Sequence, residues 1–250
     1  MKKIIIAILF ISLWVQACKK NETIEKQISS FNVVNAAIDI ASAKVYAADH
    51  LINWKPLPIT DAVAFTRASF FGAYAGNNYI RSVSATDTTK VLFSSNNTEE
   101  FKPAAFNTLF LCGQNGAYEG VFIKDDQIVN YTDQVMGIRI INLSPNSTPV
   151  NITLSTTSTI NETTGLAYKQ ITDFKTYPAD ATVVSMIFQI RNSTGTLLAS
   201  YTLPAKTPVS PYTNISIAHA RFKNVTLVIK GLIGTTTGAN AFGVFPVSHY

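Results

Sequence analysis

The chain has 250 residues, of which 20 are Lys or Arg and 15 are Asp or Glu, so only 14% of its residues are charged. This fraction is low beside the roughly 25% typical of soluble domains, and Thr, Ser and Asn supply most of the polarity. The basic residues form no stripe of the kind that a nucleic-acid surface needs. The composition therefore argues against a nucleic-acid partner and favours an extracytoplasmic β protein.

The first 18 residues have the pattern of a bacterial secretion signal. Lys2 and Lys3 precede an apolar run over residues 4–15, and Cys18 follows shortly after. A helix that spans a bilayer needs about 20 apolar residues, so a cleaved signal is favoured over a retained membrane anchor. The ending Val15-Gln16-Ala17-Cys18 resembles a bacterial lipoprotein signal. A plain secretory signal with an incidental cysteine is the other alternative.

The resemblance implies that Cys18 carries lipid and that the chain is cut directly before it. We therefore expect a signal peptide at residues 1–17 and a lipidated tether at residues 18–30. The lipid is the predicted membrane partner, and it would place the protein in the outer membrane, at the cell surface or on the periplasmic face. A lipidated Cys18 leaves Cys112 without a partner for a disulfide bond.

The remaining chain contains an internal duplication. Val33-Val34-Asn35 matches Ile140-Ile141-Asn142, and further matches follow in the same order. They join residues 71–74 to 174–177, 90–92 to 196–198, 108–113 to 226–231, and 120–122 to 243–245. The order predicts one repeat at residues 31–125, a linker at 126–137 and a second repeat at 138–250.

Most of the matching blocks have the pattern of β-strands. Val184, Met186, Phe188 and Ile190 alternate with Ser185 and other polar residues, which is the period of a half-buried strand. Each repeat has the length and the roughly seven short strands of an immunoglobulin-like sandwich. We predict an all-β chain with two tandem immunoglobulin-like β-sandwich domains after a lipoprotein signal peptide. A single large barrel is the alternative.

Residues 138–152 resemble the opening of a domain of unknown function that often occurs in tandem in secreted and lipid-anchored bacterial proteins. That family opens with Asn-x-Ser-Pro and continues with Pro-Val, a pattern matched here by Asn142, Ser144, Pro145, Pro149 and Val150. The resemblance implies β-sandwich modules outside the cytoplasm and no established chemistry. Asn146 and Asn151 replace the Asp residues common in the family, which argues against an acidic metal site.

No catalytic constellation is evident in the sequence. The three histidines, His50, His219 and His249, lack metal-ligand spacing, and His249 is expected to fray at the chain end. Cys112 matches Lys230 in the second repeat and is therefore expected near solvent. We predict no enzyme activity, no cofactor and no metal. A pair of carboxylates could still serve a glycosidase, so an envelope glycoside hydrolase is the third alternative.

Aromatic residues near the two insertions are the candidate ligand contacts. Trp54 and Tyr212 lie in the insertions that distinguish the repeats, and Tyr46 precedes the first of them. Such rings stack on sugars or anchor proteins, although a lone Trp can also fill a core. We therefore predict a lipid-anchored, non-catalytic binding or adhesion module for a glycan or protein ligand. A structural spacer subunit of an outer-membrane complex is the second alternative. Asp87-Thr88-Thr89 resembles an O-glycosylation site of Bacteroidota.

Overall fold

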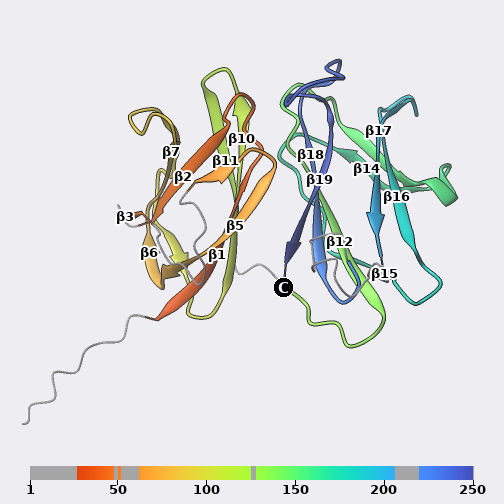
Figure 1. Ribbon diagram of the computed structural model, residues 1–250, viewed down its shortest axis with the longest axis horizontal. Coiled ribbons are helices and arrows are strands. Elements are labelled where there is room, and N and C mark those ends of the chain that lie inside the picture. The colour runs from red at the N-terminus through yellow and green to blue at the C-terminus, as the bar shows by residue number, and fades with distance from the viewer. Residues whose placement is uncertain (1–26, 48–49, 52–61, 125–127, 206–219, 250) are drawn as a thin grey trace, which may run out of the picture.

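The computed structural model describes residues 27–47, 50–51, 62–124, 128–205 and 220–249. These residues form β-strands and one short 3₁₀ helix, η1 (Ser155–Thr157), and none of them is in an α-helix. The prediction of an all-β chain is therefore confirmed. The strands fall into two groups that lie side by side (Figure 1). We call the described parts of 27–124 the first half and those of 128–249 the second half.

The first half contains two sheets and a small strand pair. The first inner sheet has the order β11 (Ala117–Ile123), β10 (Phe106–Gln114), β1 (Ile28–Asn35) and β5 (Arg67–Tyr74). The first outer sheet has the order β3 (His50–Leu51), β2 (Ser42–Ala47), β7 (Ile80–Ser84) and β8 (Val91–Ser94), with β4 (Val63–Ala64) also paired to β2. The separate pair is β6 (Gly76–Asn78) with β9 (Glu99–Phe101).

The second half repeats this plan. The second inner sheet has the order β15 (Lys175–Pro178), β12 (Val135–Asn142), β18 (Asn224–Lys230) and β19 (Gly243–His249). The second outer sheet has the order β14 (Asn161–Leu166), β13 (Val150–Leu154), β16 (Ser185–Arg191) and β17 (Leu197–Pro204). Both inner sheets therefore contain one parallel pair flanked by antiparallel strands.

The strand registers of the two halves agree. Val33 of β1 lies opposite Leu109 of the parallel strand β10, and Ile140 of β12 lies opposite Leu227 of β18. These are the residues that the sequence matches equate. Because a slip of one residue would move every side chain to the other face, an identical register means that the same positions face the same way.

Irregular features also recur at matching places. The pairing of β7 with β8 shifts between Ser82 and Val83, and that of β16 with β17 shifts between Ile190 and Arg191. Such a bulge bends its strand and increases the local twist. The repeated bulge shows that the two halves share their backbone irregularities as well as their strand order.

A buried asparagine ends the first strand of each half. The Asn35 amide donates to the carbonyls of Ile40 and Val63, and its oxygen accepts from a backbone N–H. The Asn142 amide donates to Ser147 Oγ and to the carbonyl of Leu166, and its oxygen likewise accepts from a backbone N–H. Buried backbone groups need such partners, so each asparagine ties three chain segments together.

Two of the predicted matches are out of register by one residue. Strand pairing places Val244, and not Gly243, at the position equivalent to Gly120. Likewise, Lys175 takes the place predicted for Phe174. In β19 both faces carry apolar residues, so the sequence there does not mark the core side, whereas the matched Phe174 lies just before β15.

Two boundaries also differ from the expected ones. β1 begins at Ile28, inside the tether predicted for residues 18–30. β12 begins at Val135, inside the linker predicted for residues 126–137. Regular structure therefore starts three residues earlier in each half than the hydrophobic pattern suggests.

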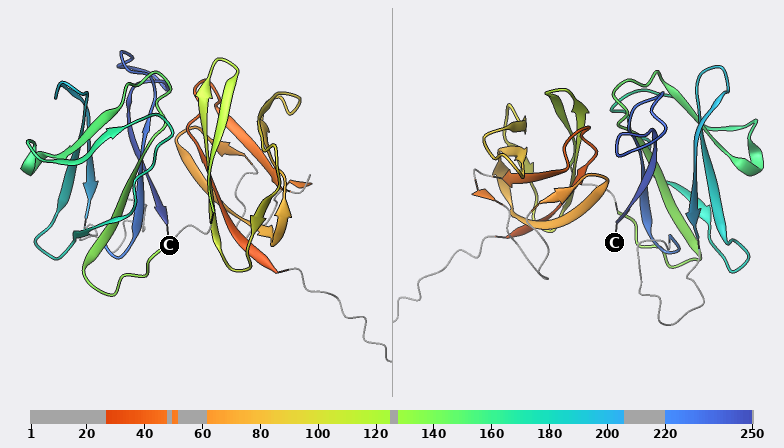
Figure 2. Two further views of the ribbon diagram at one scale, coloured as in Figure 1. Left: turned by 180° about the vertical axis from the view of Figure 1, so that it is seen from behind. Right: turned by 45° about the horizontal axis from the view of Figure 1, so that its top comes forward.

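Three apolar cores hold the sheets together. One lies between the inner and outer sheets of the first half and includes Phe31 and Leu109, and another lies between those of the second half and includes Ile152 and Phe188. The third lies between the two inner sheets and contains Val34, Ala36, Phe110, Cys112, Ile141, Leu143, Val228, Phe245 and Val247. We call this third core the junction. The inner sheets therefore face each other across the middle of the molecule, as both views of Figure 2 show.

Candidate functional site

The structure describes one of the four residues predicted for lipid attachment or ligand contact. Tyr46 lies in β2 with a half-buried side chain, on the opposite face from the core residues Val45 and Ala47. Cys18, Trp54 and Tyr212 lie outside the described residues, so their roles stay predictions. The structure therefore neither brings the three aromatic candidates together nor separates them.

Two cationic side chains share the face of Tyr46. Arg81 of β7 lies directly opposite Tyr46, and Lys44 precedes Tyr46 by two residues on the same strand. We call these three residues the Tyr46 face. Within the described part of the chain, no hydrogen bond or ion pair occupies their side chains. A phenol ring beside two cations can stack on a flat ligand and bind acidic groups.

On the equivalent face of the second half, the polar side chains form hydrogen bonds with one another. Thr153 takes the place of Tyr46, and Gln189 takes the place of Arg81. Arg191 donates through Nη2 to Gln189 Oε1 at 2.7 Å, through Nε to Thr153 Oγ1 at 3.3 Å, and through Nη1 to the Gly195 carbonyl at 2.8 Å. The polar groups of this face are therefore satisfied by one another, which leaves few donors for a ligand.

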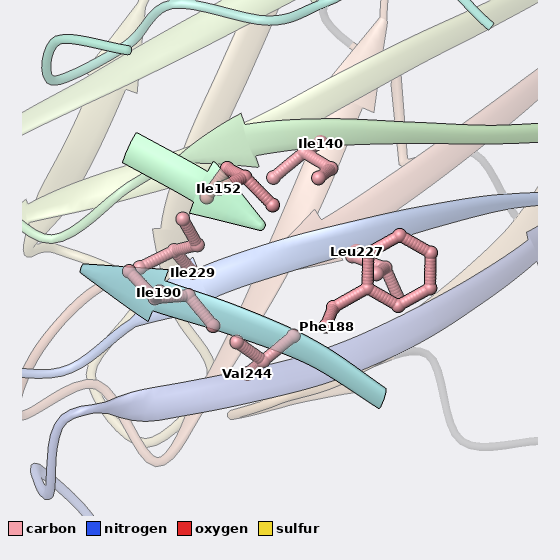
Figure 3. Close-up of a pocket in the computed structure, with 7 residues that line it drawn as sticks. All are labelled: Ile140, Ile152, Phe188, Ile190, Leu227, Ile229 and Val244. Carbon is pink, nitrogen blue, oxygen red and sulfur yellow. The ribbon is translucent and has the colours of Figure 1, made fainter. Parts of the chain in front are cut away.

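The interior space of the second half is not a ligand site. Seven apolar side chains from the two facing sheets point toward one another around it (Figure 3). They are Ile140, Ile152, Phe188, Ile190, Leu227, Ile229 and Val244. The gap between them has no room for a water molecule, so it is an ordinary packing space of the core.

The described residues also form neither a metal site nor a membrane-spanning helix. No group of three or more His, Cys, Asp or Glu side chains lies close enough together to hold a metal ion within the described ranges. No helix there is long and apolar enough to cross a membrane.

One rim of the junction is a cluster of polar side chains around Cys112. The Tyr168 hydroxyl lies 3.3 Å from Cys112 Sγ and 3.2 Å from Glu119 Oε2. Lys169 Nζ donates to Glu119 Oε1 at 2.7 Å. Since Cys112 and Glu119 belong to the first half and the other two residues to the second, this cluster ties the halves together.

The expectation that Cys112 lies near solvent is wrong, since its side chain is 0% exposed. The expectation came from its match to Lys230, but Lys230 is itself only partly exposed and reaches backbone carbonyls at the junction rim. A long lysine stem can cover apolar surface while its ammonium group finds polar partners, so a lysine does not mark an open position.

Burial makes the Cys112 thiol unreactive. Burial raises the pKa of Cys112 to about 11, and the hydrogen bond with Tyr168 only partly offsets this rise. Burial also raises the pKa of Tyr168, and the neighbouring Cys112 and Glu119 raise it further. The hydrogen bond to Glu119 raises the pKa of Lys169. Thiol and phenol therefore stay protonated near neutral pH, so neither side chain is an activated nucleophile.

The opposite rim of the junction uses different groups. Asn240 Nδ2 donates to Asp39 Oδ1 at 2.6 Å. Lys230 Nζ donates to the carbonyls of Ala239 and Ala241 at 3.0 and 2.7 Å, and lies 5.8 Å from the centroid of the Phe65 ring. Burial lowers the pKa of Lys230. Both rims hold the halves in one arrangement.

The expectation that His249 frays is also wrong. Its side chain is buried, and Nε2 lies 2.7 Å from Thr226 Oγ1, which also accepts a hydrogen bond from Arg139 Nε at 2.8 Å. The Phe174 ring packs against both the Arg139 guanidinium and the His249 ring. Because β19 is paired along its length to β18, its last residues are part of the sheet.

The comparisons with known proteins identify no family for this chain. No family model matches it, and no curated protein does either. A leucine-rich repeat protein from Bacteroides thetaiotaomicron resembles it with 10% identity and a TM-score of 0.18, over 83% of this chain. The match spans only 26% of that protein, and a score this low carries no argument about fold or function.

Proposed function

We propose that this chain is a cell-envelope lipoprotein, held in the outer membrane through Cys18, whose two tandem immunoglobulin-like β-sandwich modules act as a non-catalytic binding or adhesion unit. Its ligand is a glycan or a protein with acidic groups. Tyr46, Trp54 and Tyr212 are its aromatic contacts. Lys44 and Arg81 supply charge.

The observation that supports this proposal is the contrast between the two outer faces. The Tyr46 face carries a ring and two cations without partners among the described residues. On the matching face of the second half, Arg191 donates hydrogen bonds to Gln189, Thr153 and Gly195. A binding surface needs groups that a ligand can engage at little cost, because each internal bond that must be broken subtracts from affinity.

The test is a binding screen with the soluble chain, residues 19–250, against acidic and neutral polysaccharides and envelope proteins. We expect acidic ligands to bind and Tyr46→Thr to weaken binding about fivefold, since an aromatic contact contributes roughly 1 kcal/mol. Thr153→Ala is the matched control at the equivalent position and should leave affinity unchanged. Equal binding by both variants, or hydrolysis of a polysaccharide by the parent chain, would contradict the proposal.

Membrane attachment needs a separate experiment in cells. The native chain should fractionate with the outer membrane, and Cys18→Ala should release it. Digestion of the native protein by external protease would support a surface location, and protection would support the periplasmic face. A Cys18→Ala chain that stays as firmly bound as the native one would refute the lipid anchor.

A spacer role is the second candidate, and the junction favours it. The two halves share a buried core and contacts at both rims, which suits a rigid element that sets a distance. A spacer would co-purify with a membrane complex and would tolerate both Tyr46→Thr and Trp54→Ala. A binder would lose its ligand with either change.

A further inference from the structure

Equivalent residues of the two halves meet at the junction. The strand registers equate five buried or half-buried pairs across the inner sheets. The pairs are Val34 and Ile141, Ala36 and Leu143, Phe110 and Val228, Val121 and Phe245, and Ile123 and Val247. Both halves therefore use the same patch of the same sheet to contact each other. Contacts of this kind are typical of the interface of a twofold-symmetric homodimer.

The rim contacts repeat with the roles of the halves exchanged. Tyr168 of the second half contacts Cys112 of the first, and Phe65 of the first half lies against Lys230 of the second. Phe65 and Tyr168 hold equivalent positions, because each precedes a residue with positive φ whose N–H donates to Asn35 or Asn142.

Cys112 and Lys230 are equivalent in the same way. Each ends the buried stretch of its strand, directly before a glycine of positive φ, 99° at Gly113 and 81° at Gly231. A side chain at either glycine would collide with a backbone oxygen, at Ala117 or at Ala241. One contact is thus made twice, as a twofold axis requires.

We infer that the junction is an exchangeable interface, and that the inner-sheet face of each half accepts the complementary half of a second copy of this chain. In such an exchanged dimer, the first half of one copy packs on the second half of the other through the junction described above. The surface suits this because its centre is apolar and its few polar groups lie at the rims, so two copies bring no like charges together.

The connection between the halves allows the exchange. Residues 128–134 contain no strand, and most of them are exposed. The carbonyl of Val129 accepts a hydrogen bond from Asn224, so the segment is fastened to the second half from that residue on. Shortening the chain before Val129 should therefore separate the halves of one copy without disturbing this contact.

The experiment removes residues 124–128 from soluble 19–250, which shortens the reach of the connection by roughly 17 Å. We expect a dimer of twice the parent mass in light scattering. Cys112, the one cysteine within residues 19–250, serves as the reporter. In the exchanged dimer it stays covered, so its labelling by a thiol reagent should remain at least tenfold slower than in the urea-unfolded chain.

Two controls separate the outcomes. Inserting five Gly and Ser residues at the same place should give a monomer with protected Cys112. Adding Phe110→Asp to the deletion should abolish the dimer and speed labelling, since a charge would be buried in the junction. A folded monomer of the deletion chain, or a dimer with freely labelled Cys112, would overturn the inference.

A second measurement covers a deletion chain that fails to fold. Two full-length copies with different tags are unfolded together in urea, refolded at high concentration and captured through one tag. Recovery of the second tag, abolished by Phe110→Asp, supports exchange through the junction. Recovery of the captured tag alone would overturn it.

Discussion

The two halves of this molecule have the same buried structure but carry different side chains on their outer faces. Both halves have the same strand order and register. Each also has a bulge, after Ser82 or Ile190, and a buried asparagine, Asn35 or Asn142. The outer faces have diverged, with a ring and two cations on one and a closed hydrogen-bond network on the other. The junction combines both behaviours, because its centre is apolar in both halves while its rims use different chemistry.

This contrast shows which positions the fold constrains. A buried residue has neighbours on all sides, so any change alters packing or leaves a polar group without a partner. An outward residue on a sheet touches only its strand neighbours and solvent. Tyr46 is half-buried and Arg81 is exposed, so changes at these two positions cost little stability, and such positions are free to acquire a ligand.

The largest expected effect comes from breaking the junction. Phe110→Ala should lower the free energy of unfolding by about 4 kcal/mol, because it empties a fully buried site between the inner sheets. Urea unfolding followed by fluorescence measures it. Phe106→Ala, on the same strand but 40% exposed, is the matched control and should cost much less. Equal losses would mean that the junction contributes little.

The buried asparagines test whether the halves are equivalent inside. Asn35→Ala and Asn142→Ala should each lower the free energy of unfolding by about 3 kcal/mol, since each leaves buried carbonyls without donors. The two losses should be similar in urea titrations. Asn97→Ala, in an exposed bend, serves as the control. A large loss in one half alone would refute the equivalence.

Cys112 gives the junction a pH dependence. Its pKa in the folded chain is raised to about 11 from 9.0, so folding favours the protonated thiol. The stabilisation is fully present below pH 9 and is lost as the pH rises through 11, at a cost of roughly 2 to 3 kcal/mol.

The measurement is the difference in unfolding free energy between the parent chain and Cys112→Ala. This difference should be constant from pH 7 to 9 and should shrink above pH 9. Because other Tyr and Lys residues titrate in both chains, the comparison cancels their effect. A difference that does not change up to pH 11 would contradict a buried thiol.

The smallest effect is expected at the exposed part of the rim. Lys169→Met should lower the free energy of unfolding by no more than about 0.5 kcal/mol, because its ion pair with Glu119 is open to solvent on both sides. The effect should vanish in 1 M salt. Tyr168→Phe, which removes the hydroxyl of a half-buried side chain beside Cys112, should cost more and respond less to salt.

Much of the fold is readable from the sequence, because the information is local. Alternation such as that of residues 184–190 predicts a strand, and repeated blocks such as 33–35 and 140–142 predict repeated strands. The match of Asn35 to Asn142 correctly equated two residues with the same buried role. The slip at Gly243 arose where both faces of β19 are apolar, since alternation then marks no core side.

The sequence also contains a pattern that indicates the junction. Residues 108–112 and 225–229 are unbroken runs of buried residues, and strands buried on both faces show such runs in place of alternation. The runs indicate a second covering layer but do not identify it. Lys44 and Arg81, likewise, are neighbours of Tyr46 only through the pairing of β2 with β7.

The sequence by itself determined the all-β class and the repeated order of strands. These follow from the period of two residues and from short-range preferences that each segment carries alone. The tertiary structure alone decided that Cys112 and His249 are buried, that the inner sheets meet face to face and that Arg81 stands beside Tyr46. Those facts depend on contacts between segments distant in the chain, where packing overrides the local pattern.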